Sequence, residues 1–177
     1  MNDKQSVISL LTETNDQFNT YINTLNKSQF EINPNNKWSA GQDLQHLVKV
    51  LQIVNIGFSI PKFILSILFG KNNNEPRTLE TLRNTYNNAL SNGAKSPAIY
   101  IPKPILFQSK ENLLKKHVKL NQSLTNKINN TSETDLDNYR LPHPILGKVT
   151  LRELAIFSGF HTQHHLVLLN KKIGEAI

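Results

Sequence analysis

The sequence contains no cysteine, and this absence sets the first limits on its chemistry. Without thiols the chain cannot form disulfides, hold a metal through thiolates or use a cysteine nucleophile. The first residues also lack the basic stretch, the long apolar run and the small-residue cleavage site of a secretory signal. Together these absences lead us to expect a reduced, cytoplasmic compartment.

Long apolar runs are missing as well. The most apolar window, residues 50–69, is interrupted by two amide side chains, a proline and a lysine, which makes it a poor membrane span. Pro61 instead predicts that a long helix ends here and that a short second helix follows. We therefore expect no membrane partner.

Acidic residues are outnumbered, with 13 Asp and Glu against 20 Lys and Arg, and the net charge is +7. A basic chain can bind nucleic acid when its cations cluster opposite phosphates. Here they are scattered, and the largest groups are Lys115, Lys116 and Lys119 and the pair Lys171 and Lys172. No recognisable nucleic-acid motif accompanies them, so we expect a basic surface and no nucleic-acid partner.

Helical periodicity dominates what is present. The length of 177 residues suits one domain, residues 1–177, and apolar residues recur at helical spacing in four stretches. Ser39 is a good N-cap for the second stretch, and Thr150 with Glu153 fits a capping box for the fourth. These features predict an all-α four-helix bundle. The expected helices are Lys4–Leu25, Ser39–Pro61, Ser109–Ile128 and Thr150–Lys172.

The connections between these helices differ in length. Asn33–Asn36 breaks the chain after the first helix, whereas Gly70–Lys110 forms a long excursion between the second and the third. The excursion holds one short expected helix near Leu79–Leu90, and only Ala98–Ile101 in the whole chain reads as a strand. Long excursions of this kind often form lids or the walls of a site.

Two histidines on the expected fourth helix are the most informative residues. His161 and His165 stand four apart, so their rings project from one helical face, which Leu154 and Leu168 continue as a core face. Paired imidazoles in an apolar core are costly without hydrogen bonds, and a shared divalent cation would use both lone pairs. Core histidines with ordinary hydrogen bonds remain the alternative.

A third ligand would have to come from another helix, and His46 is the best candidate. It lies about two turns into the expected second helix, next to the buried stripe. Asp43, one turn earlier, either orients an imidazole or is an acid that the helix dipole favours.

The other three histidines have less specific surroundings. We expect His164 at the surface or in a subunit contact of a homodimer, since it points away from the His165 face. His117 is either a boundary residue or a fourth ligand. His143, between two prolines, is expected to shape a loop or to line the rim of a pocket.

Taken in order, Trp38-Ser39, His46-Leu47, the segment His143–Thr150 and His161-x-x-His164-His165 resemble the DinB/YfiT-like superfamily over nearly the whole chain. The resemblance implies a four-helix bundle of up-down-down-up topology with a metal held by three histidines. Carried over by position, these are His46, His161 and His165. The long excursion resembles only a subset of the superfamily, and no family substrate-binding residue can be matched within it.

Three imidazoles around a divalent ion leave a position open for water or substrate, and they suit Zn²⁺, Ni²⁺ or Fe²⁺. Relatives imply two chemistries at such an ion: transfer with a low-molecular-weight thiol, and hydrolysis. The thiol would be a cosubstrate, since the chain has no cysteine, and no Glu stands between His161 and His165 to act as a general base. We predict a metal-dependent enzyme with a small-molecule substrate. Thiol S-transfer is the first hypothesis, and a hydrolase or a non-catalytic metal-binding bundle is the alternative.

Overall fold

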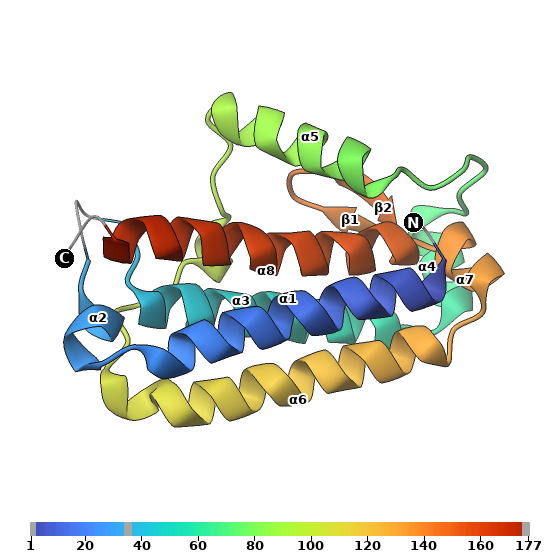
Figure 1. The fold of residues 1–177 in the computed structure, drawn as a ribbon. Helices are drawn as coiled ribbons and strands as arrows, with labels where there is room; N and C mark the ends of the chain where they lie inside the picture. The colour runs from blue at the N-terminus through green and yellow to red at the C-terminus, as the bar shows by residue number, and fades with distance from the viewer. Residues whose placement is uncertain (1–2, 34–36, 175–177) are drawn as a thin grey trace.

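Four long helices form the frame of the computed structural model, which describes residues 3–33 and 37–174 (Figure 1). They match the four predicted helices with small shifts at their ends, because the apolar stripes face one another across the bundle. Most of the predicted break at Asn33–Asn36 lies outside the described residues. The four helices are α1 (Lys4–Thr24), α3 (Ala40–Ser59), α6 (Lys110–Asn129) and α8 (Leu151–Gly174).

The directions of these helices give the bundle its topology. α1 packs against α8 and α6, and α3 packs against the same two helices. α3 and α6 run in one direction, and α1 and α8 run in the other (Figure 1). The up-down-down-up order is therefore confirmed. Consecutive parallel helices require a connection that returns along the bundle, and this is the structural role of the long excursion.

Two reciprocal caps fix where α3 and α8 begin. The Ser39 side chain accepts a hydrogen bond from Gln42 N, and the Gln42 side chain accepts one from Ser39 N. Glu153 N donates to Thr150 Oγ1 at 3.1 Å, and Thr150 N donates to Glu153 Oε2 at 3.0 Å. Because each box satisfies donors that a helix start leaves unpaired, the register of both helices is set at a defined residue.

The chain bends before the excursion begins. After Pro61 the short helix α4 (Lys62–Phe69) leaves α3 at an angle of 101°. Within the described residues no single helix meets the length and hydropathy of a membrane span; α3 and α4 pass that test only as a bent pair, on length and composition alone. The division of the apolar window by Pro61 is as predicted.

The excursion itself returns across α8. The helix α5 (Leu79–Ser91) lies over α8, as Figure 1 shows, and two 3₁₀ turns follow, η2 (Ala98–Tyr100) and η3 (Phe107–Ser109). The prediction of a strand at Ala98–Ile101 is wrong. Pro97 starts a turn there, in which Tyr100 N donates to the Pro97 carbonyl at 2.9 Å.

A hairpin and two short helices were not predicted. The strands β1 (Arg140–His143) and β2 (Gly147–Thr150) form an antiparallel hairpin, closed by a turn in which Gly147 has a φ of +72°. Pro142 within β1 conceals the strand in the sequence, but a two-stranded hairpin tolerates it because each strand is an edge. The other two elements are the short helices α2 (Lys27–Glu31) and α7 (Glu133–Asn138).

The apolar core consists of two clusters that meet within the bundle. One lies toward the hairpin and includes Leu51 and Phe160, and the other lies toward α2 and includes Leu47 and Leu169. Along α8 the boundary between the clusters falls at His161 and His165, and along α3 it falls just after His46, between Val48 and Leu51. The polar centre of the molecule is thus enclosed by apolar side chains on both sides.

Candidate metal centre

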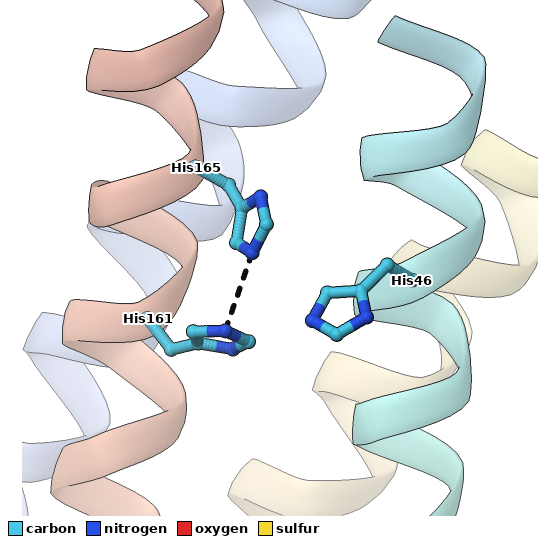
Figure 2. A group of neighbouring side chains, drawn as sticks. All are labelled: His46, His161 and His165. Carbon is cyan, nitrogen blue, oxygen red and sulfur yellow. Dashed lines mark hydrogen bonds between the residues drawn. The ribbon is translucent and has the colours of Figure 1, made fainter. Parts of the chain in front are cut away.

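His46, His161 and His165 come together between α3 and α8. The three side chains are buried, with exposed fractions of 4%, 4% and 6%, and Figure 2 shows their rings pointing into one common space. One ligand atom from each lies within 4.8 Å of the others. Among residues 3–33 and 37–174 this is the only group of three or more His, Cys, Asp or Glu side chains close enough to share an ion.

The spacing of two of the three ring nitrogens fits a shared ion. His161 Nε2 and His165 Nε2 are 3.2 Å apart (dashed line in Figure 2). Two imidazole nitrogens on one tetrahedral ion, each at ~2.0–2.1 Å, would be roughly 3.3 Å apart. Without an ion, one of the two nitrogens has to carry a hydrogen and donate it to the other.

Two of the rings are held by hydrogen bonds at the nitrogen that faces away from the common space. His165 Nδ1 donates to Asp43 Oδ1 at 3.0 Å, and His46 Nδ1 donates to the Tyr100 carbonyl at 3.1 Å. Each bond fixes the tautomer and leaves Nε2 with its lone pair, which is the usual support of a metal-ligating histidine. Of the two hypotheses for Asp43, orientation of an imidazole fits the structure, although the residue also lies in the first turn of α3.

The third ring and the carboxylate complete the surroundings. His161 Nδ1 is buried without a hydrogen-bond partner among the described residues, and the ring stacks on Phe157 with centroids 4.8 Å apart. The second oxygen of Asp43 forms an ion pair with Lys172, whose Nζ also donates to the Trp38 carbonyl at 2.9 Å. Asp43 is therefore fully engaged by its two neighbours.

Burial keeps the three imidazoles neutral. It lowers the pKa of His161 and His165 well below the usual value, and the neighbouring imidazoles lower both further. Burial also lowers the pKa of His46. For Asp43, burial raises the pKa to about 6, against the opposing effect of the Lys172 cation. Near pH 7 the three rings are thus in the form that donates a lone pair to a metal.

The three histidines line a large cavity with a volume of about 870 Å³. Its walls are formed by α3, α8, the hairpin and the excursion, from α5 to the η2 turn. Most of the lining is apolar, including Val50, Val54, Leu154 and Phe157. A pocket of this size with a few convergent polar groups has the usual form of a small-molecule site. The excursion is a wall of the site, as its length predicted.

The remaining predicted histidines fall in three different places. His143 has both predicted roles: its Nδ1 accepts hydrogen bonds from the backbone of the hairpin turn at 3.1 and 3.2 Å, and its ring lines the cavity. His164 is half-buried and lines the cavity, so it does not lie on the outer surface, and a subunit contact stays a prediction. The reason is α5, whose Tyr86 ring lies 5.8 Å from the His164 ring.

His117 is neither a boundary residue nor a member of the group of three. It is fully buried on α6, with an exposed fraction of 0%, and its Nδ1 lies 2.7 Å from Asn19 Oδ1. Burial lowers its pKa to about 4. The apolar stripe of α6 predicted that this ring would face inward, but not which partner it would meet.

Some residues of the site escaped the sequence prediction. Tyr86 comes from α5 and places its ring 5.9 Å from that of His161, and burial raises its pKa to about 12, so the hydroxyl stays protonated. Trp38 packs 5.0 Å from His46 and stacks on His165 at 6.3 Å. Trp38 appeared only as part of a motif, and no signal in the sequence pointed to Tyr86.

The fold and the site define a class: a helical bundle in which histidines from two helices meet beside an apolar cavity. The family model of the DinB superfamily matches residues 10–169 of the chain. The protein therefore belongs to the DinB superfamily, and the resemblance read from its motifs is confirmed. No curated protein matches the chain in sequence.

A solved structure gives the same fold. YfiT from Bacillus subtilis superimposes with a TM-score of 0.61 at 17% sequence identity, covering 97% of this chain and 87% of that one. That protein is described as a probable metal-dependent hydrolase with an unusual four-helix bundle topology. At this identity the likeness shows the fold.

Proposed function

We propose that His46, His161 and His165 hold a divalent ion and that the protein is a metal-dependent enzyme with a small-molecule substrate. The observation that carries the proposal is that ring nitrogens of three neutral histidines meet at the wall of the cavity. Among the described residues no fourth His, Cys, Asp or Glu joins the group. Three protein ligands with one side open to a cavity are typical of catalytic rather than structural sites.

The donor set fits Zn²⁺, Ni²⁺ or Fe²⁺, all of which accept imidazole ligands. When bound, such an ion supplies a Lewis acid that lowers the pKa of a thiol or a water beside it. The chain's own residues prepare the site. Asp43 and the Tyr100 carbonyl hold two of the rings, and Phe157 shields the third from water.

Thiol S-transfer is the reaction that we favour. Of the described residues that line the cavity, only Asp43 carries a carboxylate, and that carboxylate already binds His165 and Lys172. Hydrolysis usually employs a carboxylate or another base near the attacking water. A thiol has a pKa of ~8.5, so it loses its proton far more readily than water and needs less help from a base. The sulfur would form a bond to an electrophilic carbon, and the leaving group would depart with the proton passing to solvent.

Hydrolysis is the second candidate, supported by the description of YfiT as a probable metal-dependent hydrolase. In that reaction the imidazole of His164, which lines the cavity, would be the group that takes up a proton, since the Nδ1 lone pair of His143 already accepts two backbone hydrogen bonds. A non-catalytic metal-binding bundle is the third outcome. The cytoplasmic compartment, the homodimer and the lack of a nucleic-acid partner stay predictions.

The test starts with metal analysis of protein purified without an affinity tag. Protein loaded with Zn²⁺, Ni²⁺ or Fe²⁺ is then assayed with electrophilic aromatic compounds and a panel of small thiols, and in parallel with esters. Thiol-dependent turnover that disappears in His161→Ala supports S-transfer, and thiol-independent ester cleavage supports the hydrolase. Metal without either activity favours the non-catalytic bundle. A protein that takes up no metal, even from added Zn²⁺ or Ni²⁺, would refute the whole proposal.

A further inference from the structure

The cavity has two chemically different ends. One end lies near the start of α3 and the end of α8, and three exposed lysines line it: Lys37, Lys95 and Lys171. The other end lies near the hairpin, where apolar side chains of α3 and the residue after it, α4, α8 and the hairpin form the wall. These are Val54, Ile60, Phe69, Leu141, Ile145 and Leu154. The histidines of the metal centre lie between the two ends.

The length of the apolar end follows from the geometry of α3. The cavity-lining residues of this helix continue beyond His46 from Val50 to Ile53 and Gly57, and Ile60 follows directly after the helix. With a rise of ~1.5 Å per residue, the stretch from Val50 to Ile60 spans about 15 Å. The apolar end can therefore take a chain or ring system of that length, laid along α3.

The lysine end has an excess of positive charge. The only carboxylate among the described lining residues is Asp43, and Lys172 already forms an ion pair with it. Lys37 and Lys95 thus line the cavity with no acidic side chain other than Asp43 among the described residues of its wall. Cations at the mouth of a low-dielectric cleft attract anions and concentrate them there.

The apolar end has no matching charge. Among the described residues that line this end, the only ionisable side chain is His143, whose Nδ1 already accepts two backbone hydrogen bonds from the hairpin turn. A ligand with charges at both ends would leave one of them desolvated and unpaired, which is strongly unfavourable. The cavity wall therefore favours a ligand with one charged end and one apolar end.

We propose that the cavity binds an amphipathic anion: an apolar body along α3 toward the hairpin, and an acidic group near Lys37 and Lys95. Its middle then lies beside His46, His161 and His165. That the reacting atoms belong to this middle part of the ligand rests on the proposed function. The binding mode itself does not rest on it.

Trp38 provides a direct readout, because it is the only tryptophan of the chain and lines the cavity. Decanoate, decanol and acetate, kept below their aggregation limits, are titrated against Trp38 fluorescence. The titration is done with the protein as purified and again after metal removal. Decanoate should saturate the signal in both forms, with an affinity at least ~10-fold above that of decanol, and acetate should have no effect. Equal affinities for decanoate and decanol, or no saturable signal with decanoate, would overturn the inference.

Three variants locate the two ends. Ile53→Glu places an acid on the apolar wall at a half-exposed position, and we expect it to weaken decanoate and decanol alike by ~10-fold or more. The double variant Lys37→Glu/Lys95→Glu should weaken decanoate about 10-fold and leave decanol unchanged. Lys119→Glu, an exposed site on α6 outside the cavity, makes the same kind of charge change as a control and should alter neither. A decanoate-to-decanol ratio that the double variant does not change would refute the role of the lysines.

Metal content is measured on the same samples, so the two proposals fail separately. Protein that holds stoichiometric metal but does not bind decanoate contradicts the amphipathic anion and leaves the metal centre intact. Protein that binds decanoate with the predicted preference but takes up no metal supports this inference and refutes the proposed function.

Discussion

Two helix–helix interfaces of the bundle, here called seams, each bury histidine, but they do so in different ways. Between α3 and α8, three rings meet with their nitrogens facing one another and a cavity. Between α6 and α1, His117 is buried alone, with Asn19 at one nitrogen and the Phe18 ring 5.7 Å away. No residue of α1 or α6 lines the cavity.

The comparison shows that burial does not identify a ligand. Desolvation lowers the pKa of the histidines in both seams, so both hold neutral rings at pH 7. What distinguishes the α3–α8 seam is that lone pairs converge and that a small molecule can reach them. Variants of the two seams should therefore differ, most strongly in metal binding and less strongly in stability.

Removal of a ring from the α3–α8 seam should abolish stoichiometric metal binding. We expect His161→Ala and His46→Ala each to lose more affinity than the ~10–100-fold that the loss of a ligand's hydrogen-bond partner causes. His117→Phe is the control from the other seam and should keep its metal. Metal per chain is measured by elemental analysis after dialysis. Stoichiometric metal in both alanine variants would show that the ligands are wrongly assigned.

Asp43→Asn should weaken metal binding without removing a ligand. The amide can no longer stabilise His165 as an anion does, and Lys172 loses its ionic partner, so we expect an affinity loss of ~10–100-fold. Competition with a chromophoric chelator measures it. Asp16→Asn, at an exposed position on α1, is the matched control. An affinity equal to that of the unaltered protein would mean that the Asp43–His165 bond has no part in binding.

His117 should make folding sensitive to acid. Its pKa is about 4 in the folded protein and ~6.5 in an unfolded chain, so protonation favours unfolding. The stabilisation is complete above pH ~6.5 and is lost as the pH falls toward 4, by on the order of 3 kcal/mol at most.

His117→Phe tests this by removing the titrating group. At pH 7 the variant should be less stable by about 1 kcal/mol, since a hydrogen bond to Asn19 is lost. Between pH 6.5 and 4 the free energy of unfolding should decline less steeply than in the unaltered protein. Urea unfolding of both metal-free proteins over this range measures the slopes, and equal slopes would contradict the prediction.

His164→Ala should have the smallest effect. The residue lines the cavity, but it is not one of the three converging rings, so metal content should be unchanged and stability should shift by less than ~1 kcal/mol. Elemental analysis and thermal unfolding provide the measurements. Loss of metal from this variant would show that His164, rather than His165, is the ligand on α8.

The bundle and two of the histidines could be predicted from local sequence alone. Apolar periodicity gave the long helices, and the caps at Ser39 and Thr150 gave their starts, because both signals act within a turn or two of the chain. The four-residue spacing placed His161 and His165 on one face for the same reason. His46 needed the additional argument that its stripe faces inward.

The rest depended on contacts between distant residues. Asp43 and His165 are 122 positions apart in the sequence, and no pattern near either residue predicts that the two form a hydrogen bond. α5 covers His164 through packing that only the folded excursion creates. The hairpin at Arg140–Thr150 was hidden because prolines usually argue against strands.

The hydrogen bond from His46 to the Tyr100 carbonyl joins the proposed metal centre to the wall of the cavity. Because the acceptor is a backbone atom, a change in the path of the chain at this position changes the support of the ring. Binding free energies are reciprocal between linked sites. If an ion binds as proposed, any ligand that draws the segment around Tyr100 toward or away from α3 will therefore alter the affinity for the ion, and the ion will alter the affinity for that ligand by the same factor.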